Sequence, residues 1–184
     1  HKSDVGGVVL QLDDELGVHQ AAIAMLARAR RLQPLALVQG FCVQTMVRRP
    51  HARELIVGSH VDPLFGPVIL FGAGGTAVEV VADRAVALPP LNQFLARRLI
   101  ERARVSEMLA EWRGTPAANL EAVEQILLRV SEMVCALPQL REMDINPIIV
   151  DEHGAVAVDA RIVIDHAAQA SSSGINNYNH LAIL

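Results

Sequence analysis

The chain has 184 residues, of which 52% are hydrophobic and 20% charged, and this composition excludes an intrinsically disordered protein. Aromatic residues make up only 3%, so Ala, Val, Leu and Ile must form the core of one sizeable domain. The net charge of -4 and the lack of a long basic run argue against nucleic-acid binding, and the apolar runs fall short of the roughly 20 residues that a membrane span needs.

Apolar patterning in the N-terminal part predicts one long helix between strands. Residues 8–12 follow two glycines and are typical of a strand. Asp13 then begins a helix that ends before Pro34, because proline cannot continue it. Residues 35–38 and 42–47 are rich in apolar side chains, and we expect them to form two further strands.

The rest of the chain predicts strands, then helices, then a hairpin. The strongest helical periodicity runs from residue 120 to residue 133, where apolar side chains recur on one face. This order of elements indicates an α+β fold. The expected elements are strands at 54–59 and 68–71, a glycine-rich loop at 72–75, a helical stretch from about 90 to 136 broken near 114–116, and hairpin strands at 145–150 and 155–164.

The cysteines and the first residue bear on the cellular context. Cys42 and Cys135 lie in apolar runs without a metal-site spacing, so we expect two unpaired thiols in a reducing cytoplasm. No basic segment precedes an apolar one near the N-terminus, which argues against a secretory signal. The chain begins with His1 and not Met, and we therefore expect it to be part of a longer polypeptide.

Two glycine-containing segments are candidate phosphate sites. Gly6 and Gly7 follow Lys2, the only lysine, so backbone N–H groups and one positive charge lie close together in the sequence. A simple turn at a flexible terminus explains this pattern equally well. The loop at 72–75 lacks the Gly-Lys-Ser/Thr of a P-loop, and its alternative interpretation is a conformationally demanding turn.

A third motif predicts a site for a divalent cation. Asp144 and Asn146 are two residues apart in a predicted strand, so their side chains share one face. The returning strand of the hairpin is expected to bring Asp159 alongside them. Such oxygen ligands suit Mg²⁺, which binds one or two carboxylates together with phosphate oxygens. A solvated polar sheet face, or turn chemistry at Asn146-Pro147, remains the alternative.

Taken in order, these segments resemble the ATP-grasp domain of the ADP-forming acyl-CoA synthetases. The matching blocks are HKSDVGGV, VQTMV, ELIVG, DPLFGPVILFGAGG, EMDINPIIV and VDARI. The resemblance implies a partial ATP-grasp fold over residues 1–165, without its N-terminal part and with mixed or antiparallel sheets flanked by helices. Residues 166–184 would then form a tail that leads to a further domain.

The resemblance also implies roles for individual residues. Asn146 and Asp159 would bind Mg²⁺ with Asp144 beside them, while His1 and Lys2 would be catalytic, His1 in a phosphohistidine relay and Lys2 at the phosphates. Sequence position alone leaves Glu54 open as a surface carboxylate and 42–47 open as core. The nucleotide-binding residues that the resemblance implies are Gly6, Gly7, Gln44, Met46, Glu54, Gly74, Gly75 and Glu79.

Two functions follow from the resemblance. The first is the ATP-binding part of an acyl-CoA synthetase, which transfers phosphate between Mg-ATP and an acyl-phosphate and works with CoA-binding and ligase domains. The run TAVEVVADRAVALPPLN resembles bacterial proteins that add a protein-lysine N-acetyltransferase domain, so the alternative is a non-catalytic or ligand-sensing domain of such a fusion. In either case we expect this segment to be inactive alone, and a homo-oligomer is a further alternative.

Overall fold

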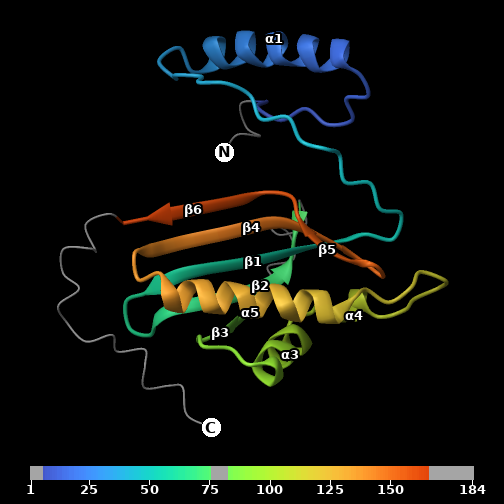
Figure 1. Ribbon diagram of the computed structural model, residues 1–184, viewed down its shortest axis with the longest axis vertical. Coiled ribbons are helices and arrows are strands. Elements are labelled where there is room, and N and C mark those ends of the chain that lie inside the picture. The colour runs from blue at the N-terminus through green and yellow to red at the C-terminus, as the bar shows by residue number, and fades with distance from the viewer. Residues whose placement is uncertain (1–5, 76–82, 166–184) are drawn as a thin grey trace. The chain divides into compact units, whose positions relative to one another are not determined.

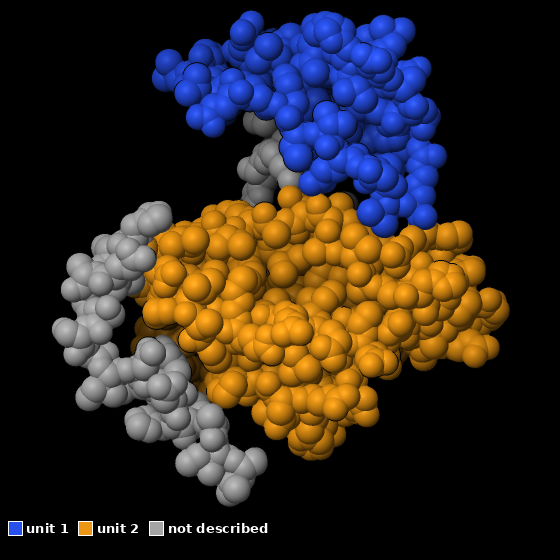
Figure 2. Space-filling model, viewed as in Figure 1, with its two compact units in different colours: residues 1–48 blue, residues 49–184 orange. Residues whose placement is uncertain are grey.

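The computed structural model describes residues 6–75 and 83–165, and the chain divides into two compact units at Arg48 and Arg49 (Figure 2). Residues 1–48 form the first unit and residues 49–184 the second. Within the described residues no helix is both long and apolar enough to cross a membrane. The expected tail at 166–184 lies outside the described residues.

The first unit consists of one helix and extended chain. Helix α1 spans Glu15–Leu32, and the side chain of Asp14 caps it by accepting a hydrogen bond of 2.7 Å from the Gly17 N–H. No residue of α1 is buried. This helix confirms the prediction made from the sequence.

The three strands predicted in the first unit are absent. Residues 8–12, 35–38 and 42–47 are described, but they form no ladder, although many of their apolar side chains are exposed. A strand needs a paired neighbour to satisfy its backbone N–H and C=O groups. These segments do not pair with one another, so their composition alone does not make them strands.

The second unit is built on a six-stranded sheet of order β3-β2-β1-β4-β5, with β6 also paired to β4 (Figure 1). Every pairing is antiparallel. The strands β5 and β6 follow one register against β4, so they form a single returning arm of the predicted hairpin. The strands are β1 (Arg53–Asp62), β2 (Gly66–Ala73), β3 (Arg84–Ala87), β4 (Leu140–Asp151), β5 (Gly154–Ala157) and β6 (Ala160–Ile164).

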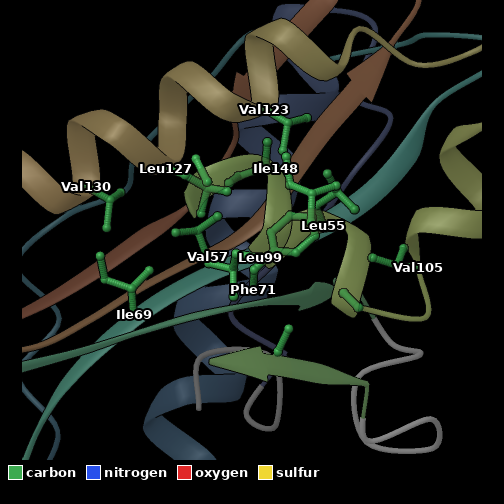
Figure 3. Close-up of a cluster of buried hydrophobic side chains, with 14 of the residues drawn as sticks. Leu55, Val57, Ile69, Phe71, Leu99, Val105, Val123, Leu127, Val130 and Ile148 are labelled. Atoms are coloured by element: carbon green, nitrogen blue, oxygen red, sulfur yellow. The ribbon is translucent and has the colours of Figure 1, made fainter. Parts of the chain in front are cut away.

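Helices cover one face of this sheet and enclose the core. The helices are α3 (Gln93–Arg102), α4 (Ser106–Leu109) and α5 (Leu120–Ala136), and Figure 1 shows α3 and α5 on the same side of the strands. Figure 3 shows Leu55 of β1, Phe71 of β2 and Leu127 of α5 gathered in this core, and all three are fully buried. The face of the sheet away from α5 is called the open face below.

Candidate functional site

The glycine-rich loop closes against strand β1 directly after β2 ends. The Gly74 N–H donates a hydrogen bond of 2.8 Å to the Glu54 carbonyl oxygen. Gly75 has a φ of 67°, and a Cβ atom added there would overlap the Glu54 carboxylate. A Cβ atom on Gly74 would likewise overlap the Leu55 backbone. A Cβ atom is excluded at Gly74 because the backbone of β1 lies in contact with it, whereas at Gly75 it would be strained by the left-handed φ and would displace the Glu54 side chain.

This loop also reaches the middle of β4. The Gly75 N–H donates a hydrogen bond of 3.0 Å to Asn146 Oδ1. Glu54, Gly74, Gly75 and Asn146, which are spread over more than 90 residues of sequence, therefore meet at one end of the loop.

Asp159 lies opposite Asn146 on the returning arm of the hairpin. The pairs Ile145↔Ala160 and Ile148↔Ala157 flank this position, and the Asn146 N–H donates a hydrogen bond of 3.1 Å to the Asp159 carbonyl oxygen. Ile145 packs against the helix-covered core, so the next residue, Asn146, points to the open face. The hairpin thus brings Asp159 beside Asn146, as the sequence predicted.

Asp144 stands two residues before Asn146 and pairs in register with Arg161 on β6 and Gly58 on β1. Partial burial raises the pKa of its carboxyl, and the negative charge of Glu142 raises the pKa further. The guanidinium groups of Arg161 and Arg84 oppose this shift. The open face therefore carries carboxylates and guanidiniums together, which is an arrangement suited to a charged ligand.

The donor set at this face fits a magnesium ion that arrives with phosphate. No cluster of three or more His, Cys, Asp and Glu residues suited to a metal exists among the described residues. Asn146 supplies an amide oxygen and Asp159 a carboxylate, so the protein offers few ligands of its own. Mg²⁺ commonly keeps water and binds substrate phosphates in addition to one or two carboxylates, so one amide oxygen and one carboxylate are chemically compatible with it.

The remaining predicted residues belong to the first unit or lie outside the described residues. Gly6, Gly7, Gln44 and Met46 belong to the first unit, where Gly6 has a φ of 64° and its carbonyl oxygen accepts a hydrogen bond of 3.5 Å from Arg28. His1, Lys2 and Glu79 lie outside the described residues. Within the second unit, the structure brings together Glu54, Gly74, Gly75, Asn146 and Asp159.

Two residues near this site escaped sequence reasoning. Asp83 is the first residue described after position 75, and its carboxylate oxygens accept hydrogen bonds of 2.7 Å from the N–H groups of Arg104 and Val105. Arg84 lies close enough to Asp144 to influence its pKa. A single acid before a short strand gives no signal in the sequence, because its partners are about 20 residues away.

Comparison with known proteins gives matches along nearly the whole chain. Residues 1–164 match the family described as ATP-grasp domain. The beta subunit of ADP-forming acetate–CoA ligase I from Pyrococcus furiosus is 37% identical over 164 residues, which make up 89% of this chain and 70% of that subunit. The ADP-forming acetate–CoA ligase I of Archaeoglobus fulgidus is 38% identical over 164 residues, but the match covers only 24% of its length.

Solved structures agree with the sequence matches. The dinucleotide-forming acetyl-coenzyme A synthetase 1 of Ca. Korarchaeum cryptofilum, in complex with coenzyme A and Ca-AMPCP, has a TM-score of 0.78 and 32% identity, covering 89% of this chain and 70% of that chain. The same synthetase with Mg-AMPPCP, and with its phosphohistidine segment pointing towards the nucleotide binding site, has a TM-score of 0.71 and 33% identity over 90% of this chain and 71% of that chain.

Proposed function

This chain belongs to the ATP-grasp family, and from that membership we propose that it is the nucleotide-binding part of an ADP-forming acyl-CoA synthetase. The reaction would transfer a phosphoryl group between ATP and an acyl-phosphate through a phosphohistidine. The observation that supports this proposal most directly is the Gly75–Asn146–Asp159 contact chain at one end of the sheet. It holds the glycine loop against two residues whose side-chain oxygens would serve as magnesium ligands.

Each residue around the glycine loop has a proposed role in binding Mg-ATP. The missing Cβ atoms of Gly74 and Gly75 let the loop lie against β1 and the side chain of Glu54, and this fixed loop would lie beside the nucleotide phosphates. Asn146 and Asp159, with Asp144 beside them, would hold Mg²⁺. When bound, Mg²⁺ neutralises charge on the phosphate oxygens. Glu54 stands at Gly75, where it would orient the nucleotide or its ribose.

Residues of the first unit, together with Glu79 of the second, complete the proposal. Gln44 and Met46 would contact the adenine, and Gly6, Gly7 and Lys2 would lie at the phosphates. His1 would take part in the phosphohistidine relay, and Glu79 would contact the nucleotide. These assignments rest on the family motifs in which the residues stand, HKSDVGG and VQTMV, together with the Glu79 that follows the GAGG loop.

The proposed partners are the CoA-binding and ligase parts of the same complex or polypeptide. The P. furiosus relative is named a beta subunit, and the A. fulgidus relative is about four times as long as the matched segment, which supports both arrangements. An N-acetyltransferase domain as a further partner rests on the TAVEVVADRAVALPPLN run alone. The relatives are ligases, so we favour catalysis over the ligand-sensing alternative.

We also propose a cytoplasmic location and association into a homo-oligomer. Cys42 and Cys135 are unpaired, which agrees with a cytoplasmic protein. Exposed apolar side chains of the first unit, among them Leu35 and Leu37, would favour association into a homo-oligomer if no other part of the polypeptide covers them.

Substitution of Asp159 tests the magnesium assignment. In the full-length protein, Asp159→Asn should weaken the calorimetric affinity for Mg-ATP at least about tenfold, because one carboxylate ligand is lost. Asn146→Ala should act in the same direction. Glu132→Ala removes an exposed carboxylate that pairs with Arg129 on α5, and it serves as the matched control with unchanged affinity. Unchanged affinity in Asp159→Asn would reject the assignment.

A further inference from the structure

An exposed arginine begins strand β3 and points to the open face of the sheet. Ala85 and Ala87 of this strand belong to the hydrophobic core or pack against it on the helix-covered side. Because neighbouring side chains of a strand alternate between its faces, Arg84 projects to the opposite side. Its guanidinium forms no hydrogen bond or ion pair with another described residue. The described residues therefore leave its charge available to a ligand.

The strand register places Arg84 level with the start of the glycine-rich loop. Arg84 pairs with Gly72 on β2, and Gly72 pairs in turn with Ile56 on β1. A Cβ atom added to Gly72 would overlap the carbonyl oxygen of Asp83, so β2 and β3 lie in close contact here. Since glycine has no side chain, β2 contributes none to this row between Arg84 and β1. The loop that holds Asn146 begins in the same row.

A buried carboxylate fixes the backbone directly before Arg84. Asp83 is only 8% exposed, and its two carboxylate oxygens accept the hydrogen bonds of 2.7 Å from the Arg104 and Val105 N–H groups at the start of α4. Asp83 therefore points to the helix-covered side, which agrees with the opposite direction of Arg84. A fixed backbone leaves only the side-chain rotamers of Arg84 to be ordered when it binds a ligand, and this lowers the entropic cost of binding.

The charge of Arg84 acts on β4 across the two strands that lie between. Partial burial and the negative charge of Glu142 raise the pKa of the Asp144 carboxyl, and the guanidinium groups of Arg161 and Arg84 oppose this rise. Strands β1 and β2 separate β3 from β4, and the β1 residue paired with Asp144 is Gly58, which again has no side chain. Arg161 already donates a hydrogen bond of 2.8 Å to Glu142. Of the two guanidiniums, Arg84 is therefore the one open to a ligand.

We propose that Arg84 binds a phosphate group of Mg-ATP on the open face. This inference rests on the proposed function, in which Asn146 and Asp159 hold Mg²⁺ beside the glycine loop. Mg-ATP keeps a net negative charge, and a guanidinium donates two parallel N–H hydrogen bonds to phosphate oxygens. Arg84 supplies this group from β3, whereas the magnesium ligands belong to the hairpin that begins with β4. Positive charge thus reaches the phosphates from both sides of β1 and β2.

Calorimetric titration of the complete enzyme with Mg-ATP tests this role. Arg84→Gln should weaken the affinity at least about tenfold, because the charged hydrogen bonds to phosphate are lost. Arg84→Lys should lose less, since it keeps the charge without the planar fork. The matched control is Arg98→Gln on α3, an exposed arginine that pairs with Glu101 and should leave the affinity unchanged. Thermal unfolding should be the same in all variants, and an unchanged affinity in Arg84→Gln would overturn the inference.

A double-mutant cycle separates phosphate binding from simple compensation of the Asp144 charge. In an Asp144→Asn background, Arg84→Gln should still lower the Mg-ATP affinity at least about tenfold, because the contact with phosphate does not depend on Asp144. If the second substitution has no effect in that background, Arg84 only balances Asp144 and the inference is wrong. Failure of the unsubstituted enzyme to bind Mg-ATP contradicts the proposed function instead, so the two failures are distinguishable.

Discussion

At the scale of single residues, the site depends on the absence of side chains as much as on their presence. Gly74 lies too close to the backbone of β1 to tolerate a Cβ atom, and Gly75 beside it has a left-handed φ and donates its N–H to Asn146. The loop is therefore connected directly to Asn146, one of the proposed magnesium ligands. A change at the loop is transmitted to β4 through that hydrogen bond.

Replacement of Gly75 by alanine is expected to displace the loop. The new Cβ atom would overlap the Glu54 carboxylate and occupy a left-handed conformation, so Mg-ATP affinity should fall at least about tenfold while the fold persists. Titration calorimetry and circular dichroism of the full-length protein measure the two effects. Gly154→Ala, at a φ of 152° with nothing within 4 Å, is the control for backbone strain alone. Equal Mg-ATP affinity in Gly75→Ala and Gly154→Ala would contradict a role for the close contact between Gly75 and Glu54.

Sequence reasoning reached part of this residue-scale picture. The spacing of Asp144 and Asn146 and the return of Asp159 were predictable, because a hairpin brings residues at similar distances from its turn side by side. The contact of Glu54 with Gly75 was not, since it depends on how β1 and β2 align. Sequence left Glu54 open as a surface carboxylate for that reason.

At the scale of elements, helices were more predictable than strands. The helices α1 and α5 follow local periodicity and carry Asp14 and Asn119 as caps. Strand β3 has four residues and exists because it pairs with β2, so it has no local signal. The same dependence on partners explains the strands wrongly predicted in the first unit.

The element-scale prediction concerns Arg53, which joins β1 to the segment between α4 and α5. Arg53→Met should lower the free energy of unfolding by about 3 kcal/mol, because buried carbonyl oxygens lose their donors. The free energy of unfolding of Arg53→Lys should lie between those of the unsubstituted protein and Arg53→Met, since one ammonium reaches fewer acceptors. Chemical denaturation provides the measurement, and Arg98→Met on the exposed side of α3 is the control. A loss below about 0.5 kcal/mol in Arg53→Met would contradict the anchoring role.

At the scale of the whole molecule, stability is concentrated in the second unit. Among the described residues, those of the hydrophobic core all lie between Leu55 and Val150, whereas α1 buries none of its residues. Helices in water are marginal without such packing. The two units should therefore differ in how readily their backbones open.

Hydrogen exchange should separate the units. In the isolated 184-residue chain, amides of α5 are expected to exchange at least a hundredfold more slowly than those of α1, because opening α5 disrupts the core. Brief trypsin treatment should cut after Arg30 or Arg31 of α1 and leave a resistant core that begins near Arg49. Equal protection of α1 and α5 would contradict this division.

The central pairing of β1 with β4 has a consequence for biosynthesis. Strand β1 ends at Asp62, but its partner is complete only at Asp151, about 90 residues later. At a translation rate of roughly 5 to 20 residues per second, synthesis of the residues up to the end of β4 takes about 5 to 18 seconds. During this time the edge of β1 that pairs with β4 has no partner. Nascent chains in that interval expose a template for wrong pairing, so the growing polypeptide should be a client for ribosome-associated chaperones.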